Sequence, residues 1–188
     1  IESMDYSYSF SEELQQEWNW KQKYGTQPEL LDYANYVCKK FDLKKNINFN
    51  TKITKAEFNN KTDKWLVKTN KNELIECKYL ILATGNLSTP NTPNIKGINN
   101  FEGNVYHTGA WPKKMPNFKG RTVGIIGTGS SGVQSIPIIA ETAKKLLVFQ
   151  RTPNFSLPAR HSELPVKKRE DYKKDYKKYR NLAKNSSF

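Results

Sequence analysis

One segment gives the strongest structural signal in this chain: Thr122-Val123-Gly124-Ile125-Ile126-Gly127-Thr128-Gly129-Ser130-Ser131-Gly132. It opens with a short apolar run and closes with the pattern G-x-G-x-x-G. A stretch compatible with a helix continues to about Lys144, and a second apolar run covers residues 146–150. A strand, a helix and a strand within about thirty residues predict a parallel βαβ unit.

The three glycines of this segment suit a turn that binds the pyrophosphate of a dinucleotide. Gly127 would permit the tight turn, Gly129 would let a phosphate approach the backbone, and Gly132 would let helix and strand pack closely. Free N–H groups and the dipole at the helix N-terminus favour an anion there. The alternative interpretation is a glycine-rich turn without a ligand.

The end of the second apolar run indicates which dinucleotide is preferred. Enzymes that use NAD usually place Asp or Glu here, to accept a hydrogen bond from the ribose 2′-hydroxyl. This chain has Gln150, Arg151 and Thr152 instead. A cation beside a hydroxyl suits a 2′-phosphate, so the sequence favours NADPH over NADH. The alternative is a surface arginine that binds nothing.

The N-terminal part alternates between irregular and regular patterns. Residues 1–24 are rich in aromatics but show no period, so we expect an irregular segment there. Thr26-Gln27-Pro28-Glu29 fits a capping box, and apolar residues at helical spacing follow it to Phe41. From Ile47 to Ile53 the apolar residues alternate with polar ones, which predicts a half-buried strand.

Two further strands are expected at Lys64–Thr69 and Leu74–Cys77, which completes a three-stranded antiparallel meander. Tyr79–Ala83 is a continuous apolar run, as in a strand buried on both faces of a parallel sheet. The stretch 86–97 then has the composition of an extended linker. From Lys167 to Lys184, cations alternate with Asp and Tyr, which predicts a solvated helix.

Composition limits the classes of function. The net charge is +13, but lysine is spread along the whole chain, so we expect no nucleic-acid partner. Cys38 and Cys77 lie far apart without a C-x-x-C pair, which predicts neither a metal site nor a disulfide framework. No apolar run reaches the length of a membrane span. We therefore expect a cytoplasmic protein without a membrane partner, of unknown oligomeric state.

A second motif precedes the glycine-rich turn. Residues 101–112, Phe-Glu-Gly-Asn-Val-Tyr-His-Thr-Gly-Ala-Trp-Pro, match F-x-G-x-x-x-H-x-x-x-W-[PD]. With this fingerprint, the chain resembles the Baeyer–Villiger monooxygenases, which are class B flavin-containing enzymes. The resemblance extends through residues 1–10, 83–85 and 148–153, and is strongest to the cyclohexanone and phenylacetone types. It implies an α/β flavoprotein with two Rossmann-like dinucleotide-binding domains.

This resemblance also implies a reaction and a set of site residues. The family uses NADPH, FAD and O2 to insert oxygen beside a ketone carbonyl, which gives an ester or a lactone. Tyr6 and Ile53 are expected to contact FAD. The residues expected to bind NADPH are Gly127, Thr128, Gly129, Ser130, Ser131, Gly132, Val133, Gln134, Arg151 and Thr152. The fingerprint residues Phe101, Gly103, His107 and Trp111 are expected to couple domain movement to the reaction.

The chain departs from the complete family pattern. The first G-x-G-x-x-G, which binds the FAD pyrophosphate, is absent, and the family's catalytic Asp and Arg have no counterpart. We therefore expect an internal fragment without catalytic residues, inactive by itself. Its expected domains are a partial FAD domain at 1–88, a fingerprint linker with the first half of the NADPH domain at 89–160, and a basic helical insertion that begins at 161–188.

Three other functions remain possible from the sequence. A flavin monooxygenase that oxidises amines or sulfides shares the two-domain layout, but its fingerprint lacks the final tryptophan found here as Trp111. A disulfide reductase of the thioredoxin-reductase type needs a C-x-x-C pair, which this chain lacks. A non-catalytic module could bind nucleic acid through the basic residues 167–184.

Overall fold

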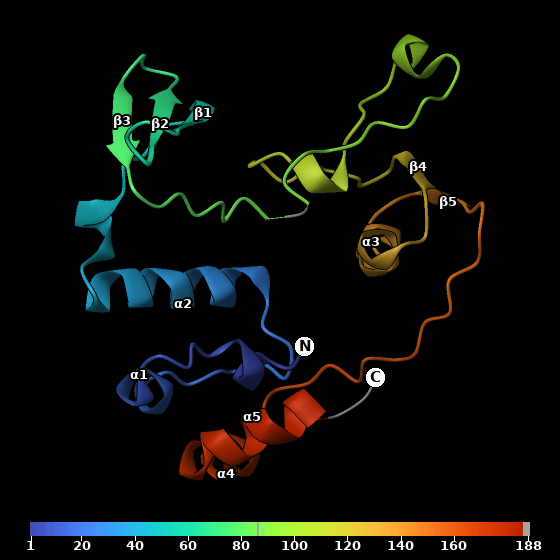
Figure 1. Cartoon of the computed structure of the whole chain (residues 1–188). Coiled ribbons are helices and arrows are strands. Elements are labelled where there is room, and N and C mark those ends of the chain that lie inside the picture. Colours follow the sequence, from blue (N-terminus) through green and yellow to red (C-terminus); the bar gives the residue numbers. More distant parts are fainter. Residues whose placement is uncertain (86, 186–188) are drawn as a thin grey trace. The chain divides into compact units, whose positions relative to one another are not determined.

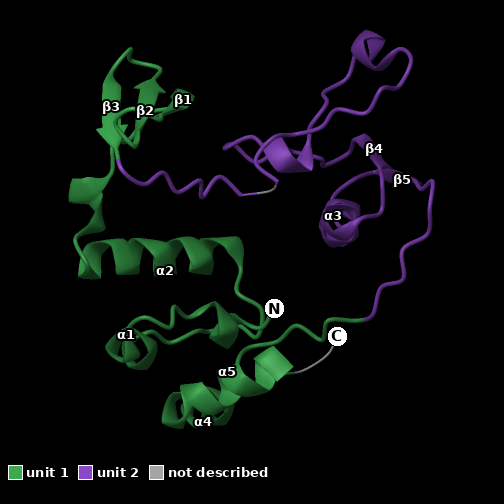
Figure 2. Ribbon diagram, in the orientation of Figure 1, with its two compact units in different colours: residues 1–77, 158–188 green, residues 78–157 purple. Residues whose placement is uncertain are grey.

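The computed structural model describes residues 1–85 and 87–185, which form two compact units (Figure 2). Unit 1 comprises Ile1–Cys77 and the C-terminal stretch from Pro158, and unit 2 comprises Lys78–Leu157. The domains expected from the sequence were divided according to the cofactor that each would bind. Contacts within the chain do not test such a division, so the expected domains stay a prediction. Residue 86 and residues 186–188, which belong to the expected domains, lie outside the described residues.

Unit 1 begins with two short helices where no periodic pattern was visible. The 3-10 helix η1 covers Ser3–Tyr6, and α1 covers Glu12–Glu17. The hydroxyl of Ser11 accepts a hydrogen bond from the N–H of Leu14 at 3.1 Å and so caps α1. The expectation of a wholly irregular segment was therefore wrong for residues 12–17.

The expected helix after Thr26 is present as α2, Gln27–Lys40, followed by the 3-10 helix η2 at Leu43–Asn46. The expected capping box is not: Thr26 makes no side-chain capping bond. Glu29 instead accepts a hydrogen bond from the backbone N–H of Lys21 at 2.6 Å. The hydrogen bond between Lys21 and Glu29 thus takes the place of the expected bond within the capping box. The proline in the first turn still favours the start of the helix.

The C-terminal stretch forms two helices, α4 at Val166–Lys174 and α5 at Tyr176–Asn185, which lie on the opposite side of α1 from α2 (Figure 1). The expectation of one solvated helix was wrong, because tyrosines spaced like a helical face pack inward. Tyr176 is 7% exposed and belongs to the hydrophobic core of unit 1, and Tyr172 packs against this core. The buried members of that core are Met4, Leu14, Trp20, Tyr33, Val37, Leu164 and Tyr176.

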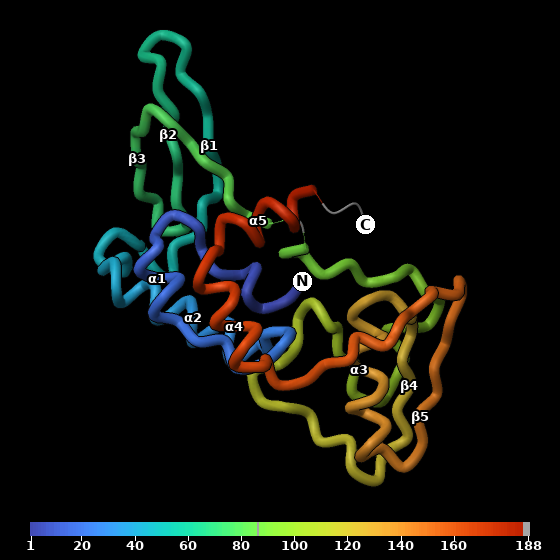
Figure 3. Tube along the Cα trace, turned by 90° about the horizontal axis from the view of Figure 1, so that it is seen from below, coloured from blue at the N-terminus to red at the C-terminus, as the bar shows by residue number. Residues whose placement is uncertain are grey.

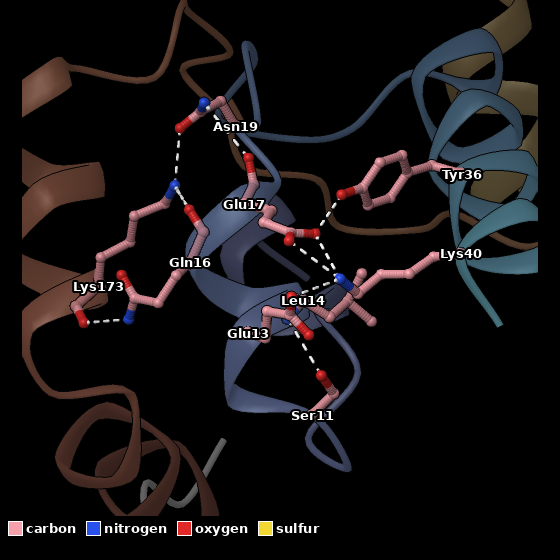
Figure 4. A network of polar contacts seen from close by, with 9 residues as sticks. All are labelled: Ser11, Glu13, Leu14, Gln16, Glu17, Asn19, Tyr36, Lys40 and Lys173. Atoms are coloured by element: carbon pink, nitrogen blue, oxygen red, sulfur yellow. Dashed lines mark hydrogen bonds and ion pairs between the residues drawn. The ribbon is translucent and has the colours of Figure 1, made fainter.

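Polar contacts fasten α1 to α2 at the edge of this core (Figure 4). Lys40 forms ion pairs with Glu13 at 3.1 Å and with Glu17 at 2.9 Å, and the hydroxyl of Tyr36 donates to Glu17. The hydrogen bond from Tyr36, followed by that from Lys40, lowers the pKa of the Glu17 carboxyl. The same contacts with Glu17 raise the pKa of Tyr36 and of Lys40.

Lys173 links α4 to α1 on the other side (Figure 4). Its ammonium donates to the carbonyl oxygen of Gln16 and, at 2.8 Å, to the side-chain oxygen of Asn19. Gln16 returns a bond at 2.7 Å to the carbonyl oxygen of Lys173. The returning C-terminal segment is therefore an integral part of unit 1.

The expected antiparallel meander is confirmed, with β1 at Ile53–Asn59, β2 at Lys64–Thr69 and β3 at Leu74–Cys77. Its first strand starts at Ile53 rather than at Ile47, because β2 reaches only as far as a partner for Ile53. All of β1 is exposed to solvent, so the expected half-buried strand was also wrong on burial.

Unit 2 contains the expected βαβ unit: β4 at Thr122–Ile126, α3 at Ser130–Ala140 and β5 at Lys145–Phe149. The strands are parallel and in register, with Thr122 opposite Lys145 and Ile126 opposite Phe149. The helix lies beside both strands (Figures 1 and 3) and buries Ile139. The helix ends at Ala140, earlier than expected, since the turn into β5 takes up the next residues.

The rest of unit 2 is irregular apart from two 3-10 helices, η3 at Ile98–Asn100 and η4 at Thr108–Ala110. The expected buried strand at Tyr79–Ala83 is wrong: Tyr79, Ile81 and Leu82 are 77%, 86% and 73% exposed, and no strand is assigned there. A strand needs a partner for its backbone groups, and the described residues place none beside this run.

Candidate functional site

The glycine-rich segment forms a tight turn between β4 and α3. Gly127 adopts a φ of 99°, a left-handed conformation in which a side chain would be strained. Its N–H donates to the carbonyl oxygen of Phe149 at 2.9 Å, which extends the ladder between the parallel strands by one bond. The turn therefore begins at the carboxyl edge of the sheet, where open α/β folds bind their ligands.

Gly132 lies in the first turn of α3, directly against Gly127. A Cβ atom on Gly132 would lie 2.4 Å from the carbonyl oxygen of Gly127, far inside a normal contact. By contrast, a Cβ atom on Gly129 would meet nothing within 4 Å. The close approach of helix and strand thus requires the last glycine, while the middle glycine faces open space. Both features fit a pyrophosphate cradle.

The N-terminus of α3 offers donors rather than a capping side chain. Gly129 is the N-cap, and the first intrahelical bond runs from the N–H of Val133 to its carbonyl oxygen at 2.9 Å. The N–H groups that precede Val133 have no partner within the helix. Gln134 and Ser135 turn back onto carbonyl oxygens of Ser130 and Ser131, at 3.1 and 2.8 Å. Hydrogen-bond donors with a positive helix end suit an anionic diphosphate.

Two residues that follow β5 hold Thr128, and no pattern in the sequence indicated either contact. The side-chain amide of Gln150 donates to the hydroxyl oxygen of Thr128 at 2.7 Å. The amide of Asn154 donates to the carbonyl oxygen of Thr128, also at 2.7 Å. Gln150 and Asn154 are candidate site residues that sequence reasoning missed, since the contacts join positions more than twenty residues apart.

The expected 2′-phosphate ligands, Arg151 and Thr152, lie between these two amides in sequence and are exposed. In the described part of the chain, Arg151 forms no ion pair with an acidic side chain. Its guanidinium is thus free to meet a ligand. The structure brings Arg151 and Thr152 to the same end of the sheet as the glycine-rich turn.

The first half of the fingerprint has a local packing role. A Cβ atom on Gly103 would lie 2.5 Å from the ring of Phe101, so a larger residue there would require that exposed ring to move. His107 caps η4: its Nδ1 accepts a hydrogen bond from the N–H of Gly109 at 3.0 Å. The spacing of these residues therefore encodes a folded loop, independent of any chemistry by the imidazole.

Trp111 packs against aromatic neighbours and faces α3 across a cavity. Its ring lies 5.8 Å from that of Tyr106 and 6.3 Å from that of Phe118, and its indole N–H points to the sulfur of Met115 at 3.5 Å. A cavity of about 370 Å³ separates this cluster from the helix. Its lining residues are Thr108, Trp111, Met115, Ser131, Gln134, Ser135, Ile138 and Ile139. Two residues expected to bind NADPH, Ser131 and Gln134, thus share a cavity with Trp111.

Tyr6 and Ile53, the residues expected to contact FAD, belong to unit 1. Tyr6 is 44% exposed in η1, with its ring 6.5 Å from that of Trp20, and Ile53 is exposed at the start of β1. Gly25 is the only glycine among residues 1–77 and 158–188. These residues therefore do not form a cradle for the FAD pyrophosphate.

Residues 1–85 and 87–185 also contain acidic residues, histidines and cysteines outside the glycine-rich turn. No group of three or more His, Cys, Asp or Glu side chains is placed to share a metal ion there. Cys38 and Cys77 are both free thiols. None of the helices in these ranges combines the length and apolarity that a membrane crossing needs.

Comparison with known proteins assigns the chain to a family. A family model described as pyridine nucleotide-disulphide oxidoreductase matches residues 3–181. The chain belongs to this family. Among curated relatives, it is 42% identical to a Baeyer–Villiger monooxygenase of Pseudooceanicola batsensis, over 98% of this chain and 34% of the relative. It is 37% identical to the phenazine N-monooxygenase of Lysobacter antibioticus, over 98% of this chain and 34% of that relative.

Solved structures of this family give the same picture. NADP+-bound cyclohexanone monooxygenase from Rhodococcus sp. Phi1 superposes with a TM-score of 0.91 at 39% identity, over 99% of this chain and 35% of that chain. The enzyme named OTEMO, in complex with FAD and NADP, superposes with a TM-score of 0.89 at 40% identity, over 98% and 36%. The chain spans about a third of the length of these family members.

These findings confirm the resemblance to Baeyer–Villiger monooxygenases and the α/β fold with an antiparallel meander followed by a parallel βαβ unit. The family name includes disulfide-reducing enzymes, but the relatives described above are named as monooxygenases. The roles of the individual site residues stay predictions, because no ligand tests them.

Proposed function

We propose that these residues form part of an NADPH- and FAD-dependent Baeyer–Villiger monooxygenase, which uses O2 to convert a ketone into an ester or a lactone. The carrying observation is the strand–turn–helix of unit 2, where Gly132 packs against the carbonyl oxygen of Gly127. The names of the relatives support the reaction class, and the cyclohexanone monooxygenase among the solved structures supports a ketone substrate.

NADPH would supply a hydride for the flavin, and unit 2 would hold it. The turn from Gly127 to Gly132, with Val133 and Gln134 behind it, presents donors to the pyrophosphate. Arg151 and Thr152, exposed at the end of β5, would bind the 2′-phosphate. The NADP+ in the similar cyclohexanone monooxygenase structure supports this assignment.

The fingerprint loop would have a conformational role. Phe101 and Gly103 shape the loop, His107 fixes its turn, and Trp111 faces α3 across the cavity. A movement of this loop would therefore reach the helix that binds the pyrophosphate without passing through other elements. Such coupling of loop position to nucleotide binding fits a role in domain movement.

For FAD, the proposal depends on the relatives rather than on the geometry. The OTEMO structure is described as a complex with FAD and NADP. Tyr6 and Ile53 could provide only peripheral contacts, since unit 1 has no glycine-rich turn. A cytoplasmic location, without nucleic-acid or membrane partners, also remains our proposal.

Oxidation of a nitrogen or sulfur atom is the second candidate function. The 37% identity to a phenazine N-monooxygenase favours it, because that name describes attack on a nitrogen rather than on a ketone. Trp111 argues for the first candidate, because it completes the Baeyer–Villiger fingerprint.

The decisive experiment offers the enzyme that contains these residues both kinds of substrate, with NADPH and O2. Chromatography would measure caprolactone from cyclohexanone and sulfoxide from thioanisole. We expect NADPH-dependent lactone formation. Oxidation of the sulfide alone would favour the second candidate, and neither product in the presence of bound NADP+ would contradict both.

A further inference from the structure

The strongest unassigned feature is the pair of amides that hold Thr128. Gln150 and Asn154 both lie beyond the residues of the glycine-rich pattern, and each donates one 2.7 Å hydrogen bond to Thr128. Asn154 donates to the backbone carbonyl oxygen and lies at a longer 3.5 Å from the hydroxyl oxygen, to which Gln150 donates. The two shorter contacts therefore fix different parts of the same residue.

The contact with Asn154 determines the direction of a backbone donor. In a planar trans peptide, the carbonyl of Thr128 and the N–H of Gly129 point in opposite directions. An amide bound to that carbonyl thus holds the N–H pointing away from Asn154. A peptide beside glycine rotates readily, because no Cβ restricts it. In the described part of the chain, the Gly129 N–H donates to no protein acceptor.

The contact with Gln150 orients the hydroxyl of Thr128. A hydroxyl has one donor hydrogen and two acceptor lone pairs. When Gln150 occupies a lone pair, the hydrogen of Thr128 turns toward a different partner. In the described part of the chain, no backbone or side-chain atom accepts that hydrogen, so a phosphate oxygen can do so.

We propose that Asn154 and Gln150 are positioning residues, which aim the Gly129 N–H and the Thr128 hydroxyl at the pyrophosphate of the dinucleotide. The inference rests on the proposed function, because it needs a dinucleotide at this turn. The same short segment bears Arg151 and Thr152. The two amides therefore also fix the spacing between the pyrophosphate site and the 2′-phosphate site.

The test compares two ligands by calorimetry on the enzyme that contains these residues. NADP+ spans both sites, whereas 2′-AMP has the 2′-phosphate but no pyrophosphate. In Asn154→Ala and in Gln150→Leu, we expect NADP+ to bind about tenfold more weakly, as for a lost charged hydrogen bond, while 2′-AMP binds within about twofold of wild type. Asn104→Ala is the matched control, because Asn104 is exposed in the same unit.

Variants of Thr128 provide a second measurement. Thr128→Ser keeps the hydroxyl and should bind NADP+ almost as wild type does. Thr128→Val should lose as much affinity as Gln150→Leu, and the double variant should lose little more, because both changes remove one interaction.

The possible outcomes separate the inference from the proposed function. Unchanged NADP+ affinity in Asn154→Ala overturns the inference. Equal losses of NADP+ and 2′-AMP also overturn it, since they indicate a general disruption of unit 2. Fully additive losses in the double variant overturn the role of Gln150. A wild-type enzyme that binds neither ligand contradicts the proposed function itself.

Discussion

A Cβ atom on Gly132 would lie 2.4 Å from the carbonyl oxygen of Gly127 and 3.2 Å from its carbonyl carbon. Both neighbours are backbone atoms, so no side chain can move aside to relieve the overlap. The last glycine of the motif is therefore required by the packing of α3 on β4. The middle glycine, Gly129, has open space around it and is not required for packing.

This difference predicts opposite behaviour for two alanine variants. Gly132→Ala should destabilise unit 2 by about 1–3 kcal/mol, as overpacking usually does. Gly129→Ala should cost less than about 1 kcal/mol, since its φ of −68° suits any residue. Urea unfolding would measure both. Gly129→Ala should nevertheless weaken NADP+ binding, because its methyl group would occupy the side from which the phosphate approaches. Similar unfolding curves for the two variants would contradict this assignment.

Ser7 makes a buried contact that joins the N-terminal segment to the core of unit 1. Its hydroxyl accepts a hydrogen bond from the indole N–H of Trp20 at 2.9 Å, and Trp20 is fully buried. Ser7→Ala would leave that N–H without a partner, at a cost of about 1–3 kcal/mol in the free energy of unfolding. Ser9→Ala, at an exposed position, should change it by less than about 0.5 kcal/mol. Equal effects would show that Trp20 does not depend on Ser7.

How much the sequence could predict depended on the range of the interactions. Strands β2 and β3 match their expected bounds, because alternation and polar turns are local signals. The run Tyr79–Ala83 failed since a strand depends on a partner elsewhere. Lys167–Lys184 failed because its charged residues outnumber the tyrosines, although Tyr172 and Tyr176 at helical spacing already indicated an inward face.

The candidate site shows the same division. The glycine spacing predicted the turn and the helix start, which the structure has at the expected residues. Nothing local indicated that Gln150 and Asn154 would reach Thr128, or that Trp111 would share a cavity with α3. Such contacts depend on the way the βαβ unit and the fingerprint loop pack together.

The raised pKa of Tyr172 predicts that the protein loses stability at high pH. Burial, followed by the charges of Asp5 and Glu2, raises the pKa of Tyr172 to about 12. An unfolded tyrosine ionises near pH 10, so above that pH the unfolded chain gains stability that the folded chain cannot match. The free energy of unfolding should thus be unaffected by this group below pH 10 and should fall between pH 10 and 12.

Urea unfolding at several pH values would measure the effect. Tyr172→Phe should show a shallower decline above pH 10 than wild type does. Tyr79→Phe is the control, because Tyr79 is 77% exposed. Parallel declines for wild type and Tyr172→Phe would show that other groups cause the alkaline transition.

The hydrogen bond that His107 accepts from Gly109 predicts that two replacements of His107 differ in their effect on the reaction. Asparagine can accept the same hydrogen bond from the N–H two residues ahead, which alanine cannot. In the active enzyme, His107→Ala should oxidise NADPH without a matching yield of ester or lactone, while His107→Asn should retain most of the coupling. Product and NADPH consumption measured together would test this. Poor coupling in both variants would show that the imidazole itself is needed.

The exposed position of Arg151 predicts that this residue makes the enzyme prefer NADPH over NADH. It follows β5 at the carboxyl edge of the sheet and meets no acidic partner in the described part of the chain, so its charge is available for a 2′-phosphate. Arg151→Ala should weaken NADPH by about 1.5–3 kcal/mol, or roughly tenfold to over a hundredfold, and should leave NADH almost unchanged. Arg121→Ala removes an exposed charge at the opposite edge, where β4 begins, and should affect neither nucleotide. Equal losses for NADPH and NADH in Arg151→Ala would show that this arginine supports the loop rather than binding the 2′-phosphate.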